Sequence, residues 1–473
     1  MSNTSTNHPP SLRVFFATEM WERYGFYVVQ TLLALYMVSH FQWNDLKVYA
    51  LVSSFTAMTY LSPIIGGWIA DNLLGQKNTI LAGAVCLFFS YTTLTVVTSA
   101  LGLLAALAGV AVGTGLLKPN ISSLLGNEYP IDSPKRESGF TIFYMGITSG
   151  IILGTTLPSQ LQSHFGWSAS FMSAAFGMLI AMSVFAMGVK KYNIEDYHPF
   201  VHSPVKLVKS ALLIALLWCV SFYIMYYPRF ADLSFSLVVL FSIAYLVNTA
   251  MRESPKQARQ TIVIGLLCVI SIMFWAFYFQ MFMSLTLYIS RVVDDKLFGI
   301  LFPPPYYVTV QSIGMLIFGY FLSRTRRTLS TQNSASTGNK FLLSMCFMLL
   351  SYSVIVYTCF RGYTSPLVLI PAYLLISIAE LLLSPVGLAA ITTLASRRKV
   401  STMMGIFFVS LGIGGFLSGK LAFITAIDPT GLTPFVLQVH YMQAFSKLLN
   451  ILFFATLLCV VLNKIIKLLL AKS

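Results

Sequence analysis

Long apolar runs, separated by short polar or basic segments, recur along the whole chain. A helix needs about 20 predominantly apolar residues to cross the hydrocarbon core of a membrane. The runs of this length lie near residues 12–39, 48–70, 78–98, 101–125, 139–160, 167–189, 207–227, 232–250, 260–289, 305–323, 340–360, 366–395, 400–424 and 441–470. The pattern predicts an all-α integral membrane protein with about fourteen transmembrane helices.

The spacing of the runs groups them as six, two and six, which predicts three parts of the chain. Residues 1–190 would form an N-terminal six-helix bundle, and residues 260–473 a C-terminal one. Residues 191–259 would supply two additional helices that link the halves. Proteins built from two such halves include secondary transporters, which bind their substrate near the bilayer midplane.

A short motif supports a repeat of the two halves. After the second run, GGWIADNLLGQK (66–77) places Asp71, Gly75 and Lys77 in a tight turn that we expect to be cytoplasmic. At the corresponding place in the second half, GYFLSRTRR (319–327) again has a glycine followed by a basic cluster. The first motif resembles the loop between the second and third helices of the major facilitator superfamily, which implies that superfamily's fold.

Composition and charge agree with a membrane protein. Hydrophobic residues make up 57% of the 473 residues and charged residues only 10%, whereas roughly a quarter of an ordinary soluble domain is charged. If the N-terminus is cytoplasmic, the outer loops keep only Lys47, Arg229, Arg291, Lys296 and Arg361. By the positive-inside rule, both termini are then expected in the cytoplasm. The net charge of +15 is therefore a topology signal, and we expect no nucleic-acid partner.

Five ionisable residues lie far from the ends of their predicted helices. Glu19, Glu22 and Arg23 occur in the stretch TEMWERYGFY of the first run, Lys118 in the fourth run and Glu380 in the twelfth. Glu19 and Arg23 are four residues apart, so they share a helix face and can pair. Glu22 points about 100° away from its neighbour Arg23 and needs another partner, for which Lys118 is the candidate.

Two interpretations of this cluster are open. Ion pairs could simply hold the first and fourth helices together, although a buried pair rarely stabilises more than packed apolar side chains do. Alternatively, protonation of Glu22 would free Lys118 or Arg23 to bind an anionic group of a substrate, as in proton-driven transport. The sequence has neither an HExxH motif nor a nucleophile with its base, so we expect no enzyme. We expect no metal or cofactor.

Several segments resemble signatures of the proton-dependent oligopeptide transporter family, in that family's order. The ExxER pattern from Glu19 to Arg23 resembles its first-helix signature. Four further segments resemble the family's second, fourth, fifth and tenth helices, in that order. They are MTYLSPIIGGWIADNLLG (58–75), GTGLLKPNISSLLGNEY (113–129), FTIFYMGITSG (140–150) and AELLLSPVGLAAITTLA (379–395). The resemblance implies a major facilitator fold that imports di- and tripeptides together with protons. Two extra helices and the short link at 361–365, after the eleventh run, resemble bacterial members, which implies a multi-pass protein of the inner membrane.

The resemblance also implies roles for the charged cluster. Glu19, Glu22, Arg23 and Lys118 would couple proton movement to peptide binding. Arg23 and Lys118 would in addition attract the carboxylate of the peptide. The partners implied are small peptides, protons and the lipid bilayer, and a single chain is expected to work as a monomer.

Further residues are implied in peptide binding by the same resemblance. Tyr27 and Tyr60 would hydrogen-bond the peptide backbone or terminus, and Glu380 would receive the peptide's amino group. Trp275 matches a pocket position of the family, and Phe407 lies where a pocket tryptophan often occurs. Both aromatic residues also fit ordinary packing in a membrane helix.

Four positions depart from the family's pattern. Gln30 stands where a basic residue is common near the end of the first-helix motif. Thr148 stands in the fifth helix where an asparagine usually helps to hold the amino group. Tyr278 and Phe279 replace seventh-helix positions that often carry glutamates, so amine recognition would depend mainly on Glu380. These changes keep open an alternative, a transporter of the same fold for another small organic substrate such as an anion or an amine-poor metabolite.

Overall fold

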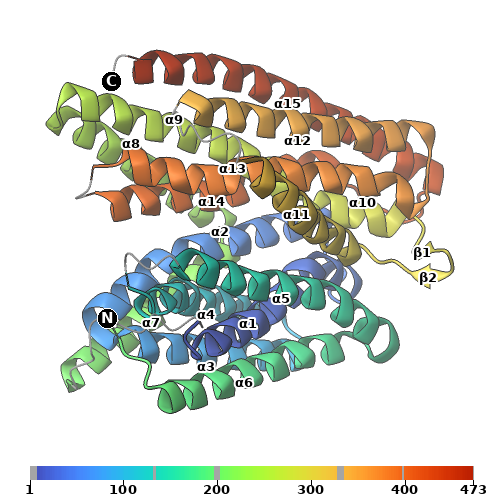
Figure 1. Ribbon diagram of the computed structural model, residues 1–473. Coiled ribbons are helices and arrows are strands. Elements are labelled where there is room, and N and C mark those ends of the chain that lie inside the picture. Colours follow the sequence, from blue (N-terminus) through green and yellow to red (C-terminus); the bar gives the residue numbers. More distant parts are fainter. Residues whose placement is uncertain (1–7, 131–134, 197–202, 327–334, 397–398, 472–473) are drawn as a thin grey trace. The chain divides into compact units, whose positions relative to one another are not determined.

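The computed structural model describes most of the chain, and Figure 1 shows the order of its elements. The residues outside the description are 1–7, 131–134, 197–202, 327–334, 397–398 and 472–473. The described ranges are helical apart from short connections and one antiparallel hairpin, in which β1 (Lys296–Leu297) pairs with β2 (Ile300–Leu301). The predicted all-α class is confirmed.

The predicted apolar runs all correspond to helices in the described ranges. These are α1 (Leu12–Ser39), α2 (Asp45–Ile69), α3 (Gln76–Val96), α4 (Ala100–Asn127), α5 (Lys135–Phe165), α6 (Trp167–Tyr192), α7 (Pro204–Tyr226), α8 (Pro228–Arg252), α9 (Pro255–Tyr278) with its continuation α10 (Ser284–Val292), α11 (Pro305–Arg326), α12 (Ala335–Arg361), α13 (Ile370–Leu394), α14 (Val400–Ala422) and α15 (Pro434–Ala471). Within the described part of the chain, 12 spans are long and apolar enough to cross a membrane by themselves. Two of the predicted transmembrane helices, α1 and α11, are not among these spans. The helix α1 carries the buried charges Glu19, Glu22 and Arg23.

The run that opens the predicted second half is not one continuous helix. Between α9 and α10, the backbone of Met283 leaves the helical region with φ −131° and ψ −97°. Backbone groups freed by such a break need partners, because lipid offers none. The Thr286 hydroxyl donates to the carbonyl of Met281 at 2.6 Å, and Gln280 donates from Nε2 to the carbonyl of Ser418 on α14 at 2.7 Å. The Thr286 hydroxyl therefore satisfies one carbonyl group at this break, and Gln280 links the break to α14.

Contacts divide the chain into two compact units, each with its own core. Unit 1 comprises the residues up to Leu33 together with Met58–Tyr227, and unit 2 comprises Ala34–Ala57 together with the residues from Pro228 onward. The helices α1 and α2 therefore each contribute to both units.

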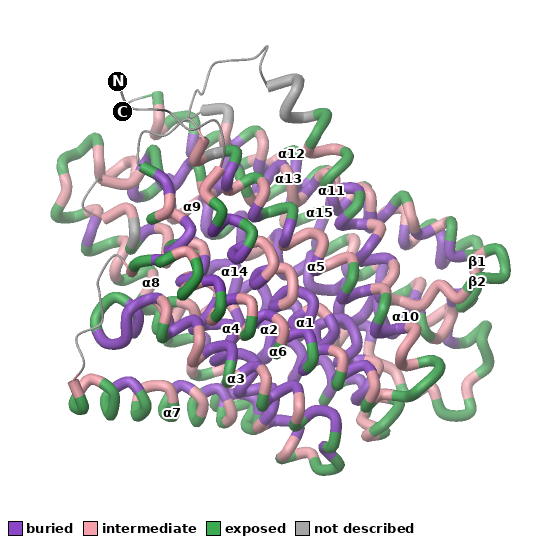
Figure 2. The backbone as a smooth tube through the Cα atoms, turned by 60° about the horizontal axis from the view of Figure 1, so that its bottom comes forward, coloured by how far each residue is buried: buried purple, intermediate pink, exposed green. Residues whose placement is uncertain are grey.

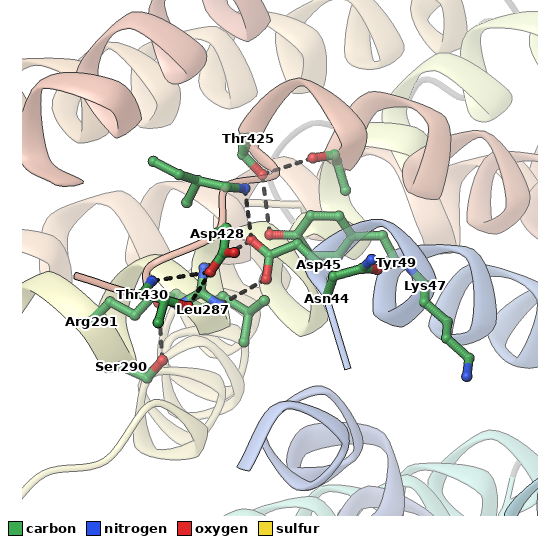
Figure 3. Close-up of polar contacts among 12 residues, drawn as sticks. Asn44, Asp45, Lys47, Tyr49, Leu287, Ser290, Arg291, Thr425, Asp428 and Thr430 are labelled. Atoms are coloured by element: carbon green, nitrogen blue, oxygen red, sulfur yellow. Dashed lines mark hydrogen bonds and ion pairs between the residues drawn. The ribbon is translucent and has the colours of Figure 1, made fainter. Parts of the chain in front are cut away.

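An ion-pair network in unit 2 ties the start of α2 to the second half of the sequence (Figure 3). Asp45 is 2% exposed, and Arg291 of α10 donates to both of its carboxylate oxygens at 2.8 and 2.7 Å. Arg291 Nη1 also donates to the Tyr441 hydroxyl of α15 at 2.8 Å, and the backbone N–H of Ile427 donates to Asp45 at 3.1 Å. Bidentate pairing of this kind fixes orientation as well as distance, which accounts for the place of Ala34–Ala57 in unit 2.

The two additional helices expose apolar side chains and are each anchored by a polar contact. In unit 1, one side of α7 is exposed along its length (Figure 2), and Trp218 donates from Nε1 to the carbonyl of Ala105 on α4 at 3.1 Å. In unit 2, Asp232 of α8 pairs with Lys420 of α14 at 2.7 Å. The exposed side chains are mostly leucines and aromatics, such as Leu212 on α7. Such surfaces suit contact with lipid.

Small residues bring α2 and α4 together in unit 1, close to Lys118. A Cβ atom on Gly66 would overlap the carbonyl oxygen of Gly115, and one on Gly115 would overlap Ser62. Asn120 donates from Nδ2 to the Gly66 carbonyl at 3.2 Å. Small residues allow such close backbone approach between membrane helices, and this crossing fixes the place from which Lys118 leaves α4.

We expect Gly66→Ala to lower the melting temperature of the detergent-purified protein, because the added methyl group must push α2 from α4. Overpacking of this kind costs about 1–3 kcal/mol. Gly67→Ala is the matched control, since a Cβ atom there has no neighbour within 4 Å. Equal melting temperatures for the two variants would contradict the close crossing.

Candidate functional site

A cluster of charges on α1 is buried inside unit 1. Glu19, Glu22 and Arg23 are 1%, 0% and 3% exposed. The Arg23 guanidinium donates from Nε and Nη2 to both carboxylate oxygens of Glu22, with Nη2 2.5 Å from Oε1. Its Nε also lies 3.4 Å from Glu19 Oε1. Glu19 Oε2 has no hydrogen-bond partner in the described part of the chain. One guanidinium therefore holds two buried carboxylates.

The expected pair of Glu19 with Arg23 forms, whereas Glu22 does not pair with Lys118. Adjacent helix residues point about 100° apart, yet the long Arg23 side chain reaches its neighbour, and its planar fork fits the carboxylate bidentately. Lys118 forms no ion pair with any described carboxylate. Its Nζ lies 5.4 Å from the ring centroid of Tyr60 on α2, and it interacts electrostatically with the three charges of α1.

The helix α5 packs on α1 beside this cluster. A Cβ atom on Gly150 would lie 2.8 Å from Arg23 Cβ, so a glycine is needed at this crossing. Thr148, a predicted binding residue, uses its hydroxyl to donate to the Tyr144 carbonyl of its own helix at 3.2 Å. Tyr27 lies one turn beyond Arg23 on α1 and interacts with it electrostatically. Of these predicted binding residues, Tyr27 and Tyr60 thus lie close to the bases.

Glu380 lies on α13, in unit 2, and forms no ion pair with a described base. Gln311 of α11 donates from Nε2 to Glu380 Oε2 at 2.7 Å. The Tyr278 hydroxyl of α9 also hydrogen-bonds this carboxyl group. Ser377, on α13 with Glu380, donates to the Gln311 carbonyl at 2.7 Å and so links α11 to α13. Neutral donors therefore hold a carboxylate that no nearby described cation balances.

The sequence did not single out Gln311 and named Tyr278 only as a departure from the family's pattern. Two features of the sequence could have indicated this contact. Gln311 is an amide within an apolar helix, and Tyr278 is a phenol at a position where the resembled family often has an acid. Trp275 is 4% exposed and packs edge-on against Tyr278, with ring centroids 4.7 Å apart. Its indole N–H has no hydrogen-bond partner among the described residues. Phe407 of α14 lies against α13 at Gly387, where a Cβ atom would overlap the ring.

The motif after α2 forms a tight turn in unit 1. Gly75 has φ +74°, a conformation that favours glycine. Lys77 donates from its backbone N–H to the Asp196 carboxylate at 2.9 Å, and from Nζ to the Ile194 carbonyl at 3.0 Å. Asp71 is exposed. The turn thereby fastens the start of α3 to the segment that follows α6.

The four charges of unit 1 sum to zero when all are ionised, with Glu19 and Glu22 against Arg23 and Lys118. Two unit charges 4 Å apart interact by about 4 kcal/mol at an effective dielectric constant of 20. An anion that enters this cluster would therefore favour protonation of a carboxylate. In the described residues, no group of three or more His, Cys, Asp and Glu side chains could hold a metal ion.

A multi-pass helical fold with ionisable groups buried inside it is typical of membrane transporters. The sequence profile of the POT family (PTR2) matches residues 77–431. The chain therefore belongs to the POT family, a family of proton-dependent peptide transporters, and the expected resemblance is confirmed.

Relatives of known name extend over nearly the whole chain. Dipeptide and tripeptide permease A of Pectobacterium carotovorum subsp. carotovorum (strain PC1) is 26% identical over 456 residues, which cover 95% of this chain and 90% of the permease. The uncharacterized transporter YclF of Bacillus subtilis (strain 168) is 29% identical over 435 residues, which cover 88% of each chain. These similarities identify a homologue of bacterial membrane permeases.

Solved structures agree with the fold. Tetrameric PepTSo2 matches with a TM-score of 0.85 at 26% identity, over 97% of this chain and 99% of that one. A bacterial homologue of the human drug peptide transporters PepT1 and PepT2 matches with a TM-score of 0.83 at 27% identity, also over 97% and 99%. The major facilitator architecture expected from the two six-helix halves is thus confirmed.

We expect Arg23→Gln to destabilise the protein strongly, because Glu19 and Glu22 then face Lys118 alone and the cluster carries a net charge of −1. Breaking a buried pair in this way costs about 3–5 kcal/mol. The double variant Glu22→Gln/Arg23→Gln returns the cluster to neutrality and should melt at a higher temperature than Arg23→Gln. The measurement is thermal unfolding in detergent. Equal melting temperatures for the double variant and Arg23→Gln would show that charge balance does not govern the stability of this cluster.

Proposed function

We propose that this chain is a proton-coupled symporter that imports di- and tripeptides by alternating access across the cytoplasmic membrane of a bacterium. The observation that carries the proposal is the neutral buried cluster of unit 1, in which Arg23 holds two carboxylates while Lys118 pairs with none. The relatives named as dipeptide and tripeptide permeases support peptides as the substrate class.

Coupling follows from the charges of this cluster. A peptide carboxylate binds Lys118 directly, or takes Arg23 from Glu22, and adds one negative charge to a neutral group. Protonation of Glu22 or Glu19 removes that excess charge, so the anion and the proton enter together. Tyr27 and Tyr60, which lie beside the two bases, donate hydrogen bonds to the peptide.

The peptide's amino group binds Glu380. The Glu380 carboxylate accepts hydrogen bonds from Gln311 and Tyr278. Both donors are neutral, so the negative charge of Glu380 stays available to an ammonium group. Trp275 packs on Tyr278 and offers an indole N–H without a partner in the described part of the chain. Of these residues, Glu380 supplies the negative charge that binds an ammonium group.

The proposed orientation places both termini in the cytoplasm. The end of α6 carries Lys190 and Lys191, and the end of α8 carries Arg252, in keeping with the positive-inside rule. The Lys77 turn lies on the same side. One related structure is described as tetrameric, and we propose that each chain works as its own transport unit.

A second candidate is a transporter of the same fold for an anion or an amine-poor metabolite. Two observations favour it. The Thr148 hydroxyl is engaged with its own helix, and Tyr278 rather than an acid faces Glu380. Such a transporter would carry a substrate without a free amino group as readily as one with it.

The decisive experiment for proton coupling is uptake of radiolabelled dialanine into proteoliposomes under an imposed inward proton gradient. We expect the wild-type protein to accumulate dialanine. Glu22→Gln should lose gradient-driven accumulation yet retain exchange of labelled for unlabelled peptide, because the binding residues remain. Glu195→Gln, at an exposed acid, is the matched control. Absence of uptake by the folded wild type, or full accumulation by Glu22→Gln, would refute the proposal.

Recognition of the amino group is tested with Glu380→Gln, which removes the carboxylate that binds the ammonium group. A hydrogen bond to a charged group contributes about 1.5–3 kcal/mol, so dialanine binding should weaken by about tenfold to a hundredfold. Binding of N-acetyl-dialanine, which lacks the charged amine, should be weak in the wild type and unchanged in the variant. Equally tight binding of the acetylated and free peptides by the wild type would instead favour the second candidate.

A further inference from the structure

Tyr91 of α3 is a buried polar residue that the transport scheme above leaves without a role. It is 0% exposed, and its hydroxyl has no hydrogen-bond partner among the described residues. A buried hydroxyl without a partner destabilises the fold, and most buried polar groups avoid this state. The position of Tyr91 therefore requires an explanation.

Gly25 allows the Tyr91 ring to reach the charge cluster. A Cβ atom on Gly25 would lie 2.7 Å from Tyr91 Cε2 and 3.4 Å from its hydroxyl oxygen, so the ring rests directly on the backbone of α1. Gly25 follows Glu22 by three residues and shares its helix face. Tyr91 also interacts electrostatically with Glu22 and Arg23. The unpartnered hydroxyl therefore lies beside the proposed coupling pair.

We propose that Tyr91 is a positioning residue for proton coupling, whose hydroxyl donates to the Glu22 carboxylate when Arg23 moves to the carboxylate of the substrate. In this structure Arg23 donates to both oxygens of Glu22, and the Tyr91 hydroxyl makes no hydrogen bond to a described residue. Once the guanidinium departs, the ionised Glu22 loses two charge-assisted hydrogen bonds, and Tyr91 replaces one of them. The inference rests on the proposed function, because it is the substrate that displaces Arg23.

The proposed hydrogen bond sets the pH at which coupling occurs. A hydroxyl that donates to a carboxylate favours its ionised form, so its removal lets the carboxylate take up a proton at higher pH. The other titratable or charged groups of the described cluster stay in place in such a variant. They are Glu19, Arg23 and Tyr27 on α1, Tyr60 on α2, Lys118 on α4 and Tyr144 on α5.

The test is gradient-driven dialanine uptake as a function of pH in proteoliposomes that contain Tyr91→Phe. This variant keeps the ring on Gly25 and removes only the hydroxyl. We expect the pH profile of uptake to shift upward by about one unit, with peptide exchange unchanged. Tyr24→Phe is the matched control, because that buried hydroxyl is bonded to Ser173 at 2.7 Å, and its profile should stay in place.

The possible outcomes separate this inference from the proposed function. A Tyr91→Phe profile that coincides with the wild-type profile, while wild-type uptake is gradient-driven, overturns the role of Tyr91 and leaves the symporter intact. A wild type without gradient-driven uptake overturns both. Gly25→Ala provides an independent variant, since its methyl group displaces the Tyr91 ring. Its profile should shift in the same direction, and an unshifted profile counts against the inference even if Tyr91→Phe cannot be purified.

Discussion

The fork of Arg23 between Glu22 and Glu19 is the interaction on which the rest of unit 1 depends. Ionised groups buried without a partner are among the most destabilising features a fold can contain, so the helices around α1 must approach closely enough to exclude solvent while the charges stay paired. Gly150 lets α5 pack at Arg23 Cβ, and Gly25 lets Tyr91 lie on the backbone of α1. The glycines therefore follow from the charges, because larger residues would separate the helices that enclose them.

The same reasoning extends to Lys118 on α4. Pro119 has no N–H to offer the carbonyl of Gly115, and it is against this carbonyl that Gly66 of α2 packs. Asn120 adds a side-chain hydrogen bond across the crossing. Helices in lipid gain little from apolar contact alone, so this close approach and its polar contact hold Lys118 near the cluster without giving it a carboxylate of its own.

Sequence reasoning predicted the helices well, because an apolar run of membrane-spanning length has few alternative structures in lipid. It failed where side-chain reach decided the outcome. The spacing argument predicted that Glu22 pairs with Lys118, because it considered only the direction of the Cα–Cβ bonds and not the length of the Arg23 side chain. It also missed the contact of Gln311 and Tyr278 with Glu380, because nothing in either helix indicates that α9, α11 and α13 meet at that carboxylate. The break at Met283 had no local signal beyond the polar Gln280.

The two units leave opposite electrostatic needs unmet, and this asymmetry gives the proposed function its physical basis. In unit 1, Lys118 is a cation without a paired carboxylate, within a cluster that is neutral overall. In unit 2, Glu380 is a carboxylate held by neutral donors, with no described cation paired to it. In the proposed function, a substrate carboxylate bound by Lys118 adds a negative charge to the balanced cluster of unit 1. Proton uptake by a carboxylate of α1 removes that excess charge, and this is the electrostatic basis of the coupling that we propose.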